Sequence, residues 1–270
     1  MSTARSVARN TLYLSAAQGI RILLAFALIL YIANFYGVVW QGKFSILLAF
    51  LNIFMVLASF GMPRLITREV ARDYDAGNRY FWSGLIAQGG TTLVFMVVMV
   101  AVVALMPYPE DTKQMLWLAV LALPLFSLYS LSGALLRANE RMQYLVYAEV
   151  LSAAAQLVVA VILLSSGAGV LALAVIRIAG IGLAALVVFI SVLVLRYIQR
   201  PSIDLHFSRQ LLRESADFFG MASFDAVLQR LDVLVLSVVA GEAATGIYDA
   251  AYQLIKVLMV LVLSFTDAIY

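Results

Sequence analysis

Long apolar stretches alternate with short polar connections along the whole chain. Each stretch has about 20 residues or more, the length that an α-helix needs to cross a bilayer core about 30 Å thick. The pattern therefore predicts an all-α protein that crosses a membrane many times. We predict eight spanning helices, at about residues 11–33, 43–62, 81–106, 114–135, 144–164, 169–195, 217–240 and 246–270.

The composition agrees with this pattern. Of the 270 residues, 64% are hydrophobic and 12% are charged, and the mean hydropathy is +1.00. A soluble domain is about half apolar and a quarter charged, so an ordinary soluble protein is excluded. Arg5 and Arg9 precede a first stretch that is too long for the apolar region of a cleaved signal peptide, and we expect a retained first span.

Arginines gather in every second connection between the predicted spans. Twelve arginines lie on one side, at positions 5, 9, 64, 68, 72, 79, 137, 141, 196, 200, 209 and 213. The connections on the other side carry only Lys43 and Lys113 as cations. Because cytoplasmic connections of membrane proteins are enriched in Lys and Arg, this asymmetry predicts a multi-pass protein of the cell membrane with a cytoplasmic N-terminus.

A short pattern, G-x4-G-x-aromatic, occurs twice. It reads "GVVWQGKF" at Gly37–Phe44 and "GEAATGIY" at Gly241–Tyr248, in connections that are six spans apart and both external. This placement predicts two parallel six-helix repeats, as in some transporters, with chance recurrence as the alternative. We expect the glycines to form sharp external loops, and Phe44 to anchor the next helix at the membrane interface.

The repeat suggests a division of the chain. We predict an N-terminal six-helix lobe at residues 1–196, a cytoplasmic linker at 197–216 and the first two helices of an incomplete second lobe at 217–270. The linker is the longest polar connection and contains Pro201 and an amphipathic-looking patch. Because the sequence ends within an apolar run, we expect a fragment of a protein with about twelve spans or more.

The sequence lacks the residues that several kinds of chemistry require. The chain has no cysteine, and its single histidine is His206. These counts argue against disulfides, thiol nucleophiles, histidine metal sites and histidine catalysis. No phosphate-binding glycine loop suggests an ATP-driven pump. We expect no metal site, no cofactor and no enzymatic activity.

Four cations fall inside predicted spans, about 12 to 20 Å from the end at which their helix begins, at 1.5 Å per residue. They are Arg21, which has Gln18 one turn before it, Arg177, Arg230 and Lys256. Charged residues at such depth are costly and mark functional sites by default. We predict that these residues line a shared polar cavity.

Two interpretations of these cations remain open. Internal acids could neutralise them, and Glu149 with Arg177 is a plausible pair because neighbouring antiparallel spans bring the two to similar depth. Arg21 has no acid in its own span, so either another helix supplies one or the charge is kept for an anionic ligand, which we favour. Asp225, Asp232 and Glu149 are the candidates for coupling an ion to transport.

Other residues have local interpretations. Glu149, Ser152 and Gln156 share one helix face, as do Asp225, Gln229 and Asp232. The small residues "AGIGLAA" at Ala179–Ala185 favour close helix packing. Arg64, Arg68 and Arg72 are interpreted as topology and headgroup contacts.

Four strings in order along the chain point to one family. They are "FYGVVWQGKFSILLAF", "LASFGMPRLITREVAR", "SGALLRANERMQY" and "LQRLDVLVLSVVAGEAATGIYDAAYQL". Together they resemble the Wzx-type polysaccharide (O-antigen) flippases of the multidrug/oligosaccharidyl-lipid/polysaccharide exporter superfamily. The resemblance covers essentially the whole chain.

The resemblance implies a MATE-like fold of two six-helix lobes around a central cavity with alternating access. It also implies flipping of a polyprenyl-pyrophosphate-linked oligosaccharide to the outer leaflet, with cavity arginines such as Arg21, Arg177 and Arg230 meeting the pyrophosphate. The expected partners are this lipid-linked oligosaccharide, the lipid bilayer and the polysaccharide polymerase machinery, and no nucleic acid.

Two other functions were considered. A cation-coupled multidrug exporter of the same superfamily would need an acid-lined cavity, whereas the first span offers Arg21. A membrane-embedded glycan polymerase or acyltransferase would need acid and base residues in a substantial loop, and the connections are short. We therefore favour the flippase.

Overall fold

The computed structural model describes residues 2–199, 201, 204–252 and 255, with side chains from Ala17 onward. The described residues form helices and short connections, with no strand among them. The elements are α1 (Ser2–Ser59), α2 (Met62–Arg72), the short 3-10 helix η1 (Tyr74–Ala76), α3 (Gly77–Leu105), α4 (Glu110–Ala119), α5 (Ala122–Ala138), α6 (Gln143–Ser165), α7 (Leu171–Val194), α8 (Leu205–Leu228) and α9 (Leu231–Val239). A further helix occupies residues 241–252.

The prediction of an all-helical, multi-pass membrane protein is confirmed. Five segments of the described chain are long and apolar enough to cross a membrane, and the first of them, Ala17–Ser59, is long enough for two crossings. The predicted third, fifth and sixth spans correspond to α3, α6 and α7. The predicted eighth span lies mostly outside the described residues.

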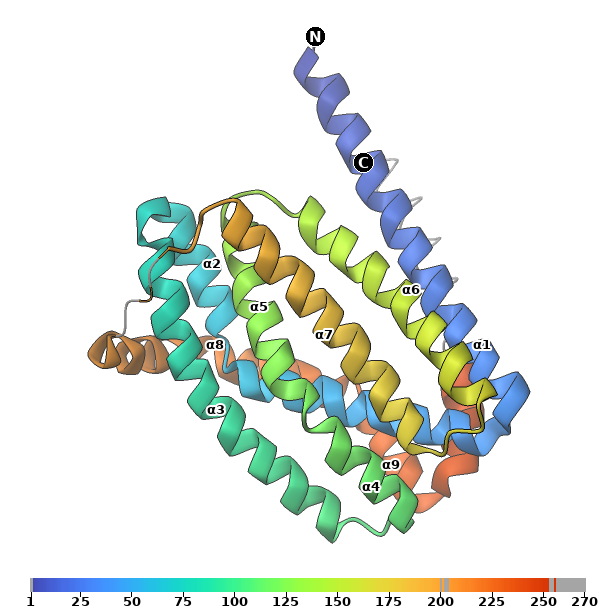
Figure 1. The fold of residues 1–270 in the computed structure, drawn as a ribbon. Coiled ribbons are helices and arrows are strands. Elements are labelled where there is room, and N and C mark those ends of the chain that lie inside the picture. Colours follow the sequence, from blue (N-terminus) through green and yellow to red (C-terminus); the bar gives the residue numbers. More distant parts are fainter. Residues whose placement is uncertain (1, 200, 202–203, 253–254, 256–270) are drawn as a thin grey trace.

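The predicted loop between the first two spans is absent. The helix continues through α1, and only Gly37 leaves it, with φ 81° and ψ 178°. Glycine adopts this backbone at little cost, so one residue makes the bend. Figure 1 shows the N-terminal part of α1 projecting past the bundle and the part after the bend running across it.

Two other predicted spans are divided. The fourth is broken at Val120–Leu121, between α4 and α5. Pro124 explains this break, because a proline lacks the N–H that would bond to residue 120 and its ring clashes with that carbonyl. The seventh is broken at Gln229–Arg230, between α8 and α9, so the face expected to align Asp225, Gln229 and Asp232 does not belong to one continuous helix.

The sequence analysis missed α2. Phe60 and Gly61 have φ values of 50° and 73° and end α1, and Pro63 follows in the first turn of α2. The helix buries Met62, Leu65, Ile66 and Val70 against the bundle. Their spacing of three and four residues is that of an amphipathic helix, a signal that was present in the sequence.

Part of the predicted linker is also helical. Asp204 caps α8 by accepting a 2.9 Å hydrogen bond from the Phe207 backbone N–H, and Arg79 donates to the same carboxylate at 2.8 Å. These two interactions, the Phe207 hydrogen bond first, lower the pKa of the Asp204 carboxyl. The cap starts α8 at Leu205, within the range predicted as linker.

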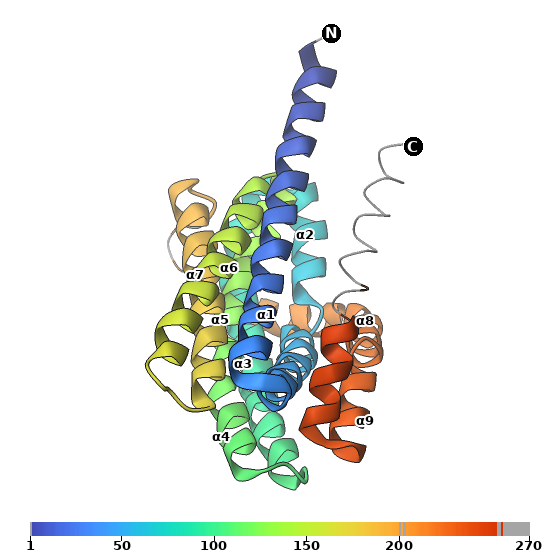
Figure 2. The ribbon, with the colours of Figure 1, turned by 90° about the vertical axis from the view of Figure 1, so that its right-hand side faces the viewer.

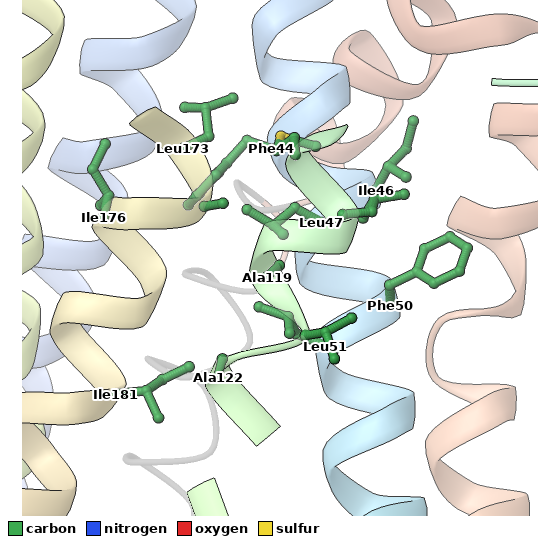
Figure 3. Close-up of a cluster of buried hydrophobic side chains, with 14 of the residues drawn as sticks. Phe44, Ile46, Leu47, Phe50, Leu51, Ala119, Ala122, Leu173, Ile176 and Ile181 are labelled. Atoms are coloured by element: carbon green, nitrogen blue, oxygen red, sulfur yellow. The ribbon is translucent and has the colours of Figure 1, made fainter. Parts of the chain in front are cut away.

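The main core lies where the second part of α1 meets α4, α5 and α7. Phe44, Ile46, Leu47, Phe50 and Leu51 of α1 are at most 2% exposed. Figure 3 shows them beside Ala119, Ala122, Leu173, Ile176 and Ile181. The expectation that Phe44 anchors the chain at the membrane interface is therefore wrong, because this side chain is part of the core.

The two glycine patterns contact one another. A Cβ on Gly42 would lie 1.8 Å from the Glu242 carbonyl oxygen, and a Cβ on Gly246 would lie 2.0 Å from the Val38 carbonyl oxygen. Figure 2 shows the bend of α1 beside the helix at residues 241–252. Gly42 and Gly246 are equivalent positions of the pattern, as are Val38 and Glu242. Each copy of the pattern therefore supplies one glycine and one backbone carbonyl oxygen to the contact. We call this pair of approaches the glycine contact.

Candidate functional site

A cavity of about 260 Å³ lies between α1, α5, α6 and α7. Its wall is mainly apolar, with six side chains that carry N–H or O–H groups or a charge. These are Arg21, Tyr129, Glu149, Ser152, Gln156 and Arg177. We call this space the central cavity.

Arg21 finds its acid on another helix. Its Nε lies 3.4 Å from Glu149 Oε2, and each of the two side chains is 35% exposed. The Tyr129 hydroxyl donates a 2.9 Å hydrogen bond to Glu149 Oε1. Gln18 Oε1 accepts from Arg21 Nε at 3.4 Å, so Gln18 supports Arg21 from outside the cavity lining.

Arg177 is held by a chain of neutral groups. Its Nη1 donates to Gln156 Oε1 at 2.8 Å, and Gln156 Nε2 donates to the Ser152 hydroxyl at 3.1 Å. That hydroxyl donates to the Gly180 carbonyl oxygen at 2.7 Å. Because the amide N–H of Gln156 is engaged, its carbonyl oxygen faces the guanidinium.

One donor of Arg177 is unused. Its Nε is buried and has no hydrogen-bond partner among the described residues. A buried, charged donor without a partner is costly, so this atom favours the entry of an acceptor.

Glycine packing positions this chain of bonds. A Cβ on Gly180 would lie 2.4 Å from Gln156 Cγ, closer than real side chains approach. The close packing predicted for Ala179–Ala185 is therefore present at Gly180. It leaves room for Gln156 between α6 and α7.

The predicted pairing of Arg177 with Glu149 is wrong. Glu149 contacts Arg21 and Tyr129, while Arg177 contacts Gln156. Depth along neighbouring helices was estimated from the sequence, but the side of the helix that faces a given neighbour was not. Of the two interpretations left open for Arg21, a partner from another helix is the one observed.

Three of the remaining candidates, Arg230, Asp225 and Asp232, are not in the lining of the central cavity. Arg230, at the start of α9, is within electrostatic range of Arg177 but does not line the cavity. Asp225 is exposed, and Asp232 accepts a 2.7 Å hydrogen bond from the Tyr248 hydroxyl. Lys256 lies outside the described residues.

Tyr129 was missed by the sequence analysis. It is a hydroxyl-bearing aromatic residue in a mainly apolar span that also contains Ser127, Ser130 and Ser132, so the sequence alone did not single it out. The described residues contain no group of three or more His, Cys, Asp or Glu side chains able to hold a metal ion. With two arginines and one glutamate, the lining of the central cavity carries a net positive charge and can accept an anion.

Comparisons with known proteins address the fold and the family. The chain is 21% identical over 268 residues to the protein named "Putative O-antigen transporter" of Escherichia coli (strain K12), covering 98% of this chain and 64% of that protein.

Solved structures of MATE transporters have a similar fold. The eukaryotic MATE transporter AtDTX14 matches with a TM-score of 0.60 at 16% identity, over 92% of this chain and 60% of that one. A MATE transporter in a bent conformation matches with a TM-score of 0.62 at 16% identity, over 93% and 60%. The MATE-like fold expected from the sequence strings is confirmed.

The family follows from a match over nearly the whole sequence. Residues 7–270 match the family described as "Polysaccharide biosynthesis protein". The chain therefore belongs to the polysaccharide biosynthesis protein family.

Proposed function

We propose that the protein moves a polyprenyl-pyrophosphate-linked oligosaccharide from the cytoplasmic to the outer leaflet of the cell membrane. The observation that carries this proposal is Arg177, a cation in the central cavity whose buried Nε has no hydrogen-bond partner in the described part of the chain. The family match and the O-antigen relative support a saccharide cargo. A diphosphate supplies several acceptor oxygens, and guanidinium groups bind phosphate oxygens through two parallel hydrogen bonds.

Glu149 has a defined role in this scheme. It forms an ion pair with Arg21, with 3.4 Å between Arg21 Nε and Glu149 Oε2. An arriving diphosphate competes with Glu149 for Arg21, so the carboxylate must take up a cation or move. Of the three ion-coupling candidates, Glu149 is thus the one in the cavity, whereas Asp225 and Asp232 would act from α8 and α9.

The chain's division supports a rocking mechanism. We retain the predicted lobe at 1–196 and the second unit at 217–270, with the arginine-rich connections cytoplasmic. The glycine contact joins these two units through equivalent residues. Rocking of one unit against the other about a central site is how many transporters alternate access.

Removal of the Arg21 charge tests the proposal. Arg21→Ala in the full-length protein is expected to abolish surface polysaccharide while membrane expression remains, because one of the two cavity cations proposed to bind the diphosphate is lost. Immunoblotting of surface polysaccharide and of the tagged protein measures both. Arg141→Ala is the matched control, since Arg141 is exposed and does not line the cavity. Full export by Arg21→Ala would refute the proposal.

Glu149 favours a second function, a cation-coupled multidrug exporter. It places a carboxylate in the central cavity, which cationic drugs require. Arg21 neutralises that carboxylate and Arg177 adds a further positive charge, so the anionic cargo is preferred. Resistance to cationic drugs on expression, without polysaccharide export, would reverse this order.

A further inference from the structure

A second cavity, of about 620 Å³, lies beside the central cavity at the junction of α1, α2, α5 and α8. Three arginines line it, Arg64 and Arg68 from α2 and Arg137 from α5. No carboxylate is among its lining residues. We call this space the arginine cavity.

The three arginines differ in their exposure and in whether an acid pairs with them. Arg68 forms a 2.7 Å ion pair with Glu69. Arg64 is exposed and Arg137 is half-buried. Neither of these two has an acid within 4.0 Å among the described residues. The guanidinium of Arg137 lies along its own helix, where a Cβ on Gly133 would be 3.5 Å from Nη2. Among the described residues, these two cations therefore share this wall without an ion-pair partner, and Glu149 is the acid within electrostatic range of Arg137.

The two cavities meet at an aromatic pair. Phe126 and Tyr129 line both of them, and their ring centroids are 6.0 Å apart. Tyr129 is held by its hydrogen bond to Glu149, the same carboxylate that pairs with Arg21. A change in the position or charge of Glu149 would therefore affect Tyr129, which lies in the wall between the two cavities.

We propose that the arginine cavity binds the phosphate group of a lipid at the membrane surface, as an entry site that is filled before the central cavity. This inference rests on the proposed function. Unpaired arginines beside neutral groups attract a multiply charged anion and offer it paired donors. The lipid is either the prenyl diphosphate cargo or an anionic phospholipid, and its phosphate is the group recognised in both cases.

The test measures binding of a soluble prenyl diphosphate. The full-length protein is placed in nanodiscs of phosphatidylcholine and titrated with farnesyl diphosphate. Arg137→Gln is expected to weaken binding about tenfold, the loss of roughly one charged hydrogen bond, and Arg137→Lys is expected to restore part of it. Arg141→Gln, at an exposed arginine nearby, is expected to bind as the unmodified protein does.

A second arm distinguishes the two lipids. The same variants are melted in nanodiscs with and without phosphatidylglycerol. If Arg137→Gln removes the stabilisation by phosphatidylglycerol but leaves farnesyl diphosphate binding intact, the entry site is assigned to the phospholipid headgroup. If Arg137→Gln matches Arg141→Gln in both arms, the entry site is refuted. The proposed function is tested separately by Arg21→Ala, whose export result does not depend on Arg137.

Discussion

The glycine contact and the arginine cavity are built on opposite principles. At the glycine contact, Gly42 and Gly246 let two backbones approach more closely than any side chain would allow. Around it, Lys43 forms ion pairs with Asp111 and, at 3.5 Å, with Glu242, so the cation is fully engaged. At the arginine cavity, Arg64 and Arg137 have no such acids among the described residues. The glycine contact is thus closed by tight packing and ion pairs. The arginine cavity instead has two arginines that remain available to bind a ligand.

This difference suggests which side of the bundle is closed in the described conformation. With the predicted orientation, the glycine contact is external and the arginine cavity is cytoplasmic. Under the proposed orientation and function, the described conformation would receive an anionic cargo from the inside.

The largest effect is expected from a side chain in the glycine contact. Gly42→Ala would place a Cβ against the Glu242 carbonyl oxygen, a backbone atom that cannot move alone. We expect the two units to separate and the unfolding free energy to fall by about 1–3 kcal/mol. Since the chain has no cysteine, a single Ser45→Cys probe reports the opening by reaction with a membrane-impermeant maleimide, because Ser45 is buried on α1 and its hydroxyl donates a 2.7 Å hydrogen bond to Asp249 of the helix at residues 241–252.

Gly19→Ala is the matched control for this comparison. Gly19 also lies on α1, and no atom is within 4 Å of its would-be Cβ. The Gly19→Ala variant should keep a cysteine at position 45 protected from the maleimide. Equal maleimide labelling in the Gly42→Ala and Gly19→Ala backgrounds would show that the contact does not close this region.

A smaller effect is expected between α6 and α7. Gly180→Ala would push against the flexible Gln156 side chain, which can move away, and Arg177 would lose its 2.8 Å hydrogen bond. We expect a loss of about 1 kcal/mol in unfolding free energy, near the lower end of overpacking costs. Thermal unfolding in nanodiscs measures it. Gly182→Ala meets only Leu125 Cδ1 at 3.5 Å and should be neutral, so similar melting of both variants would contradict this account of Gly180.

The sequence predicted the helices better than their contacts. Apolar runs located α3, α6 and α7, because a membrane-spanning helix must be apolar over a fixed length. The bend at Gly37 was interpreted as a loop, since a glycine alone does not distinguish a kink from a turn. The pairing of Arg21 with Glu149 depends on how α1 and α6 are rotated about their axes, and no local pattern contains that rotation.

For the same reason, the sequence did not predict the surroundings of Arg137. From the sequence, Arg137 is one of the twelve arginines that set the predicted orientation, because it lies at the end of a predicted span. Only packing shows that it faces a cavity shared with Tyr129. The interpretation of Arg64 changes in the same way, because α2 places this residue in the wall of the arginine cavity.

The most direct test of the central claim is to measure farnesyl diphosphate affinity after opposite charge changes in the central cavity. Arg177→Gln removes a cation and should weaken binding about tenfold, whereas Glu149→Gln removes the competing anion and should strengthen it. Isothermal titration of the full-length protein in phosphatidylcholine nanodiscs gives both values under one condition. Opposite shifts in affinity are the predicted result. Unchanged affinity in both variants, or weaker binding in both, would contradict a central cavity in which Arg177 binds the diphosphate while Glu149 competes with it for Arg21.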